Sequence, residues 1–108
     1  MLDISTHNVA QIILMARELD RAEGELRAFI ERLSEEEQIS LVALMWIGRG
    51  SFGADELEEA KATASEEATT PTADYLLGSP HLSDHLENGL DEMGISVVDD
   101  EDDLVRGG

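Results

Sequence analysis

The chain has 108 residues, no cysteine and a formal net charge of -18, from 25 acidic and 7 basic side chains. This length predicts one small domain, and the lack of cysteine excludes disulfides, thiolate zinc sites and cysteine nucleophiles. The acid excess repels phosphate backbones, so we expect no direct nucleic-acid binding. The start of the chain has no secretory pattern and no apolar run approaches the ~20 residues of a membrane span, so a cytoplasmic protein without membrane contact is expected.

Two amphipathic helices are predicted in the first third of the chain. Ser5 or Thr6 can cap the first, which is expected to run to about Arg21. Gly24 is interpreted as a break or tight turn, and a second helix is expected at about residues 25–33. The apolar positions that share one helical face are Val9, Ile12, Ile13, Ala16 and Leu19, and then Leu26, Phe29, Ile30 and Leu33.

The third predicted helix, about residues 35–48, is expected to be the centre of the fold. Ser34 and Glu37 have the spacing of a capping box at its start. Residues 39–47 are apolar nearly all round the helix, which is typical of an element covered by several neighbours. Trp46, the only tryptophan, is therefore expected to be substantially buried, and Gly48 is expected to end the helix.

The later part of the chain predicts three shorter helices. Residues 48–53 form a glycine-rich loop that lacks the Lys-Ser/Thr ending of a phosphate loop and follows no strand. A polar helix is expected at about residues 54–68, with a narrow stripe of Leu57 and alanines. Thr70-Pro71 and Ser79-Pro80 each resemble a helix start, with a capping hydroxyl before a proline.

These patterns together predict an all-α fold of five to six helices around the helix at about residues 35–48. We expect a helical domain over residues 1–98 and an acidic, disordered and flexible tail over residues 99–108. The acidic run at residues 99–103 lacks the glycine turn and the final glutamate of an EF-hand loop, so a solvated tail is favoured over a calcium site.

Three blocks of the sequence resemble one family of uncharacterised bacterial proteins, DUF3775. They are the opening Met-Leu-Asp-Ile-Ser, the central Leu-Val-Ala-Leu-Met-Trp-Ile-Gly-Arg-Gly and the later Thr-Ala-Asp-Tyr-Leu-Leu-Gly-Ser-Pro-His-Leu. A Leu-Glu-x-Gly-Leu segment at residues 86–90 adds to the resemblance, which spans about residues 1–97. It implies a small helical protein without an assigned activity. The family's longer polar stretch between the first two helices is reduced here to residues 20–25.

The sequence offers one weak candidate for a metal site. His81 and His85 are four residues apart, a spacing that places two side chains on one helical face, and Asp84 lies between them. A zinc site needs a third ligand, and His7 is better interpreted as a surface residue. A surface histidine pair is the favoured interpretation, so we expect no metal and no cofactor.

The best candidate for a polar site is Arg49 together with Asp74 and Tyr75. The Arg49 guanidinium can pair with Asp74 and so join the central helix to the later helices, or it can face a ligand anion. The structural pair is favoured. No Ser-His-Asp or paired-carboxylate arrangement follows from the spacing, so catalysis is the less favoured interpretation.

Three classes of function stay open. The first is a small acidic helical module for protein–protein interaction, without catalytic activity and with a partner not identified by the sequence. The second is an acidic nucleic-acid mimic that binds a basic DNA-binding protein, because residues 54–108 carry 16 of the acids. The third is a ligand-binding protein or enzyme that uses Arg49, Asp74 and Tyr75.

A homodimer is a further hypothesis. Leu14 and Met15 widen the apolar face of the first helix, and surplus apolar area in a small protein is often covered in a symmetric dimer. The first half of the chain carries less of the net charge, so a contact there would meet less repulsion.

Overall fold

The computed structural model describes residues 2–67 and 70–95. Within these residues the fold is all-α and contains no strand, as the sequence predicts. The elements are α1 (Thr6–Arg17), α2 (Leu19–Arg32), α3 (Glu35–Arg49), the 3-10 turn η1 (Ala54–Glu56), α4 (Leu57–Glu66), α5 (Thr72–Leu77) and α6 (Leu82–Glu92). The predicted tail at residues 99–108 and the boundary at residue 98 lie outside the described residues.

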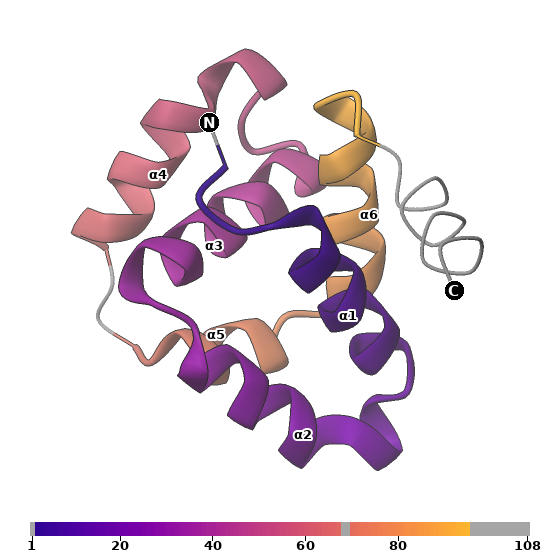
Figure 1. Cartoon of the computed structure of the whole chain (residues 1–108). Helices are drawn as coiled ribbons and strands as arrows, with labels where there is room; N and C mark the ends of the chain where they lie inside the picture. The colour runs from indigo at the N-terminus through magenta and orange to yellow at the C-terminus, as the bar shows by residue number, and fades with distance from the viewer. Residues whose placement is uncertain (1, 68–69, 96–108) are drawn as a thin grey trace.

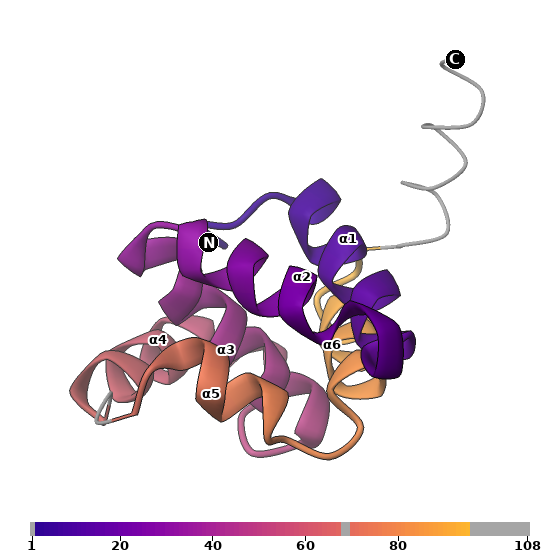
Figure 2. The ribbon, with the colours of Figure 1, turned by 90° about the horizontal axis from the view of Figure 1, so that it is seen from below.

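Helix α3 is the centre of the molecule, which confirms the prediction for residues 35–48. It packs against α6, α4 and α5, while α1 lies across α6 and α2 lies along α5 (Figures 1 and 2). Its Leu41, Leu44 and Met45 are fully buried. Because three neighbouring helices cover α3, the apolar residues around nearly its whole circumference are buried within one domain.

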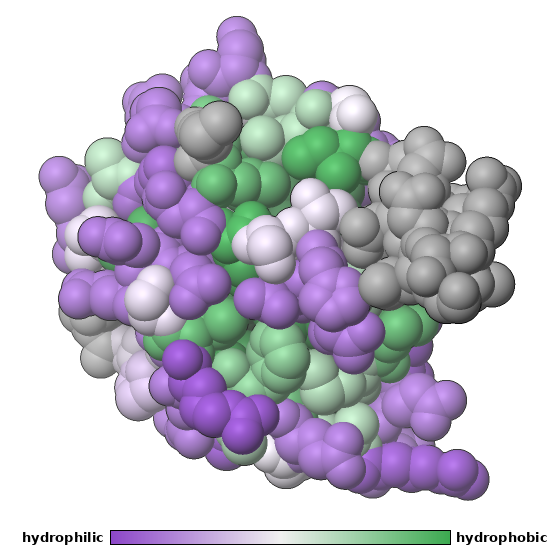
Figure 3. All heavy atoms as spheres, in the orientation of Figure 1, coloured by the Kyte–Doolittle hydropathy of each residue, from purple (hydrophilic) through white to green (hydrophobic). Residues whose placement is uncertain are grey.

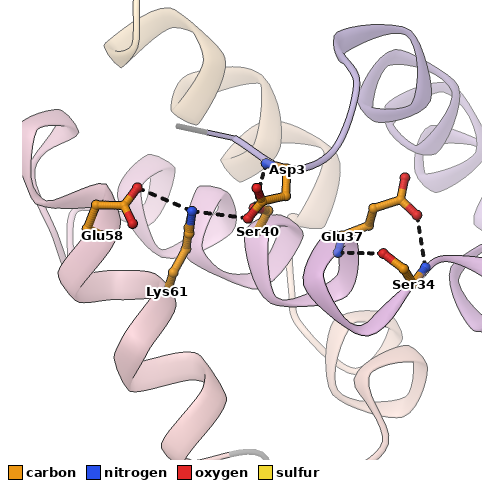
Figure 4. A network of polar contacts seen from close by, with 6 residues as sticks. All are labelled: Asp3, Ser34, Glu37, Ser40, Glu58 and Lys61. Carbon is orange, nitrogen blue, oxygen red and sulfur yellow. Dashed lines mark hydrogen bonds and ion pairs between the residues drawn. The ribbon is translucent and has the colours of Figure 1, made fainter.

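The start of α3 has the predicted capping box. The Ser34 Oγ accepts a hydrogen bond from the Glu37 backbone N–H at 3.1 Å, and Glu37 Oε1 accepts from the Ser34 backbone N–H at 2.9 Å (Figure 4). The two bonds satisfy amides that have no partner inside the helix. The acidic first turn of α3 also lies at the positive end of the helix dipole.

The predicted role of Gly48 was wrong. Helix α3 continues through Gly48 to Arg49, and Gly50, at φ 91°, is the residue that caps it. Only a glycine adopts this left-handed backbone without strain. Gly48 instead lies against the backbone of α6, where a side chain would not fit.

The predicted break at Gly24 was also wrong. The chain bends at Glu18, between α1 and α2, and Gly24 lies inside α2 with open space around it. An exposed glycine costs a helix only about 1 kcal/mol, which packing can override. The bend comes earlier because α1 packs on α6 and α2 packs on α5. The two helices must therefore run in different directions for each to bury its apolar face.

The last helix starts two residues later than predicted. The Ser79 hydroxyl donates to the Tyr75 carbonyl at 2.9 Å at the end of α5, so it does not cap α6. Helix α6 begins at Leu82, after His81, which takes a left-handed backbone at φ 59°. This conformation turns the chain sharply between the two helices.

Two ion pairs join helices that are far apart in the sequence. Arg17 of α1 pairs with Glu87 of α6, and Arg27 of α2 pairs with Asp74 of α5. All four side chains are substantially exposed, so each pair contributes little to stability. Two of the few basic residues of this acidic chain, Arg17 and Arg27, are nevertheless engaged in contacts within the molecule.

The surface is uneven in polarity. In Figure 3 hydrophilic side chains line the edges formed by α4 and α2, and apolar residues show between them. Among the described residues Leu14, 42% exposed, is the one large apolar side chain that is substantially open to solvent. Within the described residues no helix has both the length and the apolar character needed to cross a membrane.

Candidate functional site

Trp46 holds together the junction of α3 with α5. Its indole N–H donates to the Tyr75 hydroxyl at 2.8 Å, and its ring stacks on Phe52 with centroids 5.8 Å apart and an interplanar angle of 23°. Trp46 packs against the core and is only partly exposed, in agreement with the expected substantial burial. One side of the junction is therefore open to solvent.

A cavity of about 190 Å³ lies beside this junction, between α3, α4 and α5. Pockets for drug-sized ligands typically measure about 300–1,000 Å³, so this one is small. Its wall is largely apolar and aromatic, with a carboxylate and hydroxyl groups as its polar atoms. The residues that line it are Val42, Trp46, Ala64, Glu67, Thr70, Thr72 and Tyr75.

The three residues of the predicted polar site do not share one set of contacts. Asp74 pairs with Arg27, and the Arg49 Nε–H donates to the Ser51 hydroxyl at 3.1 Å. The favoured Arg49–Asp74 pair is therefore not formed, because each partner meets a closer group on its own side of the fold. Tyr75 does line a cavity, together with Trp46.

The two histidines of the predicted pair are neighbours. The His81 and His85 rings meet edge to face with centroids 6.4 Å apart, and His81 Nδ1 lies 3.8 Å from Asp84 Oδ2. The His85 Nδ1 atom is buried, and no described residue hydrogen-bonds to it. In the described part of the chain no three metal-ligating side chains gather in one place.

Helix α4 presents an acidic outer surface. Its apolar side, Leu57, Ala60 and Ala64, is buried against α3, as the sequence predicts. The opposite side and the preceding 3-10 turn carry six exposed acidic residues, hereafter the α4 acidic face. They are Asp55, Glu56, Glu58, Glu59, Glu66 and Glu67.

The single basic residue of this segment, Lys61, turns toward the core. Its side chain is only 17% exposed, and its Nζ lies 3.1 Å from Asp3 Oδ2 and 3.2 Å from Glu58 Oε2 (Figure 4). Asp3 in turn bonds to the fully buried Ser40 of α3: its backbone N–H donates to the Ser40 Oγ at 2.9 Å. This network ties α4, α3 and the N-terminal segment together.

The network shifts the pKa values of Asp3 and Lys61 in opposite directions. The hydrogen bond from Lys61 holds the pKa of Asp3 below its usual range. Partial desolvation opposes the charged form of Lys61, but hydrogen bonds to Asp3 and Glu58 outweigh it and raise the Lys61 pKa. Sequence reasoning missed this network, because Asp3 and Lys61 belong to distant segments with no periodic pattern in common.

Comparison with known families identifies one match. A family model described as "Protein of unknown function (DUF3775)" matches residues 23–95, more than half of the chain. The chain belongs to this family. The DUF3775 match includes α3 to α6 and therefore the Trp46 junction and the α4 acidic face. No curated protein and no solved structure matches the chain.

Proposed function

We propose that this DUF3775 protein is a non-catalytic interaction module that binds a basic protein partner through the α4 acidic face. The observation that carries the proposal is the separation of charge on α4. Exposed carboxylates cover its outer side, while Lys61 points inward to Asp3. An inward lysine leaves the outward field of the helix negative.

The composition of the surface supports the same partner chemistry. The described residues contain 20 acidic and six basic side chains, and Arg17, Arg27 and Lys61 are engaged in ion pairs within the molecule. Complementary potentials accelerate encounter and discriminate between partners. A basic partner thus meets an attractive surface, whereas an acidic one is repelled.

The setting of the protein belongs to the proposal as well. We place it in the cytoplasm of bacteria, in keeping with a chain that has no cysteine and hence no disulfide. A basic DNA-binding protein is one partner of the proposed chemistry, and binding to it would make the α4 acidic face a nucleic-acid mimic. Competition by duplex DNA for that partner tests this narrower form.

Calorimetric titration with a nine-arginine peptide tests the proposal. The test variant combines Asp55→Asn, Glu59→Gln and Glu66→Gln, three exposed positions outside the Lys61 network. Since an exposed ion pair contributes about 0.2–1 kcal/mol, the three changes together should weaken binding about tenfold at low salt.

The matched control combines Asp20→Asn, Glu23→Gln and Glu25→Gln on α2, and so changes the net charge by the same amount at exposed positions. We expect this variant to lose no more than about twofold in affinity, through the general loss of charge. Equal losses in the two variants would mean that the peptide responds to net charge alone, and the proposal would fail.

A further inference from the structure

We propose that the cavity between α3, α4 and α5 receives an arginine side chain of the basic partner. The inference rests on the proposed function, because it assigns a specific contact to the partner of the α4 acidic face. Glu67 belongs to both features: it is part of that face and it lines the cavity.

The size of the cavity favours a side chain. About 190 Å³ is less than the usual volume of a pocket for a cofactor or metabolite. An arginine side chain has an apolar stem that suits the Val42 and Ala64 walls, and long basic side chains commonly bury such stems while their heads stay near water.

The polar atoms of the cavity favour a cation. Glu67 contributes a carboxylate, Thr70 and Thr72 contribute hydroxyl acceptors, and none of the described residues that line the cavity is basic. Glu67 is also the residue at the C-terminal end of α4, where the helix dipole adds negative partial charge. An anion would meet unfavourable charge at the same place.

The aromatic wall favours arginine over lysine. The Trp46 ring is held in place by its hydrogen bond to Tyr75 and by its stacking on Phe52. A planar guanidinium stacks on such a ring and has five N–H donors, enough to reach a carboxylate and a hydroxyl at once. A lysine ammonium is a more strongly hydrated point charge and gains less from a flat aromatic surface.

The test uses Trp46 as its own reporter, because it is the only tryptophan of the chain. The full-length protein is titrated with Nα-acetylarginine amide, and Nα-acetylcitrulline amide serves as the neutral ligand of the same shape. We expect a saturable change in tryptophan fluorescence with the arginine compound, with a Kd on the order of 1 mM, and a much weaker response to the citrulline compound.

Two single variants locate the contact. Glu67→Gln should weaken binding of the arginine compound about threefold, in line with an exposed ion pair. Glu92→Gln removes an exposed carboxylate of α6 that belongs neither to the cavity nor to the α4 acidic face, and should leave the affinity unchanged. The inference is overturned if no saturable change occurs, if citrulline binds equally well, or if the two variants behave alike.

The same samples separate this inference from the proposed function. If the nine-arginine peptide binds and depends on Asp55, Glu59 and Glu66 while Trp46 fluorescence and Glu67→Gln report nothing, the cavity is overturned and the acidic-face proposal stands. If the arginine compound binds in the cavity but the peptide shows no preference for the α4 acidic face, the broader proposal fails and arginine binding stands.

Discussion

Gly48 of α3 and Gly89 of α6 face each other's helices where the two elements cross. A methyl group on Gly48 would lie 1.6 Å from the His85 carbonyl oxygen, and one on Gly89 would lie 2.4 Å from the Leu44 carbonyl oxygen. On α6, His85 lies four residues before Gly89, and on α3, Leu44 lies four residues before Gly48. The crossing is therefore reciprocal, and it depends on the absence of a side chain on both helices.

The crossing predicts opposite effects for two chemically identical substitutions. Gly48→Ala should lower the free energy of unfolding by about 3 kcal/mol, because the methyl group forces backbone apart. Gly24→Ala should raise it by about 0.5–1 kcal/mol, because Gly24 lies in a helix with nothing within 4 Å of the new methyl group. Urea unfolding followed by circular dichroism measures both. Equal effects would contradict the crossing.

The Asp3 carboxylate predicts a dependence of stability on pH. Its pKa is lowered in the folded state, chiefly by the hydrogen bond from Lys61, so its contribution is present above its unfolded value near 3.8 and is lost as pH falls through the folded value. The wild type should be more stable than Asp3→Asn at pH 6. The difference should shrink as the pH falls below about 3.8 and disappear below the folded pKa of Asp3. A difference that persists in strong acid would show that the Asp3 charge is not involved.

The Lys61 ammonium predicts the opposite dependence of stability on pH. Because its folded pKa is raised above 10.5, its contribution is present below that value and is lost as pH rises through the folded pKa. Lys61→Met keeps an unbranched chain without the charge. We expect it to be less stable than the wild type at pH 7, with the difference shrinking above about pH 10.5. Thermal unfolding across this range measures the trend, and a constant difference would assign the effect to packing.

The Trp46–Tyr75 hydrogen bond predicts an interaction energy of about 1 kcal/mol. A double-mutant cycle of Trp46→Phe and Tyr75→Phe isolates this energy in urea unfolding. Tyr75→Phe alone should cost about 1 kcal/mol, because it leaves the indole N–H without its partner. If the two substitutions are additive, the hydrogen bond adds nothing to stability.

Self-association through α1 stays a prediction, and the structure indicates which residue of its apolar face is suited to test it. Met15 is partly buried against the core, so a charge there would disturb the fold, whereas Leu14 is 42% exposed. Leu14→Glu is expected to dissociate the proposed homodimer without unfolding the chain. Sedimentation equilibrium at physiological salt measures this, and a wild-type mass near 11.8 kDa at micromolar concentrations would contradict the dimer.

The local signals in the sequence predicted features that lie within a single helix, although they did not fix where each helix begins and ends. The Ser34–Glu37 capping box and the apolar circumference of α3 depend on residues within one element, so their spacing predicts them. The Leu57 stripe of α4 is equally local. All of these predictions are confirmed in the described residues.

The roles of single glycines and the partners of polar side chains depend on tertiary contacts, which local sequence signals do not predict. Gly24 and Gly48 look alike as helix breakers, yet one is a tolerated exposed glycine and the other permits a helix crossing. The partner of Asp74 is Arg27 and not Arg49, because α2 rather than the end of α3 lies beside α5 at that point. The position of Tyr75 against Trp46 could be found only once both helices were placed.

The most direct test of the account is a chemical-shift map of the labelled full-length protein with the nine-arginine peptide. Binding through the α4 acidic face predicts that the largest amide shifts fall on residues 55–67, with a further change at the Trp46 indole N–H. Much smaller shifts are expected on α2, which is also rich in exposed acids. Shifts that are largest on α2, or confined to the acidic segment at residues 99–103, would contradict binding through α4.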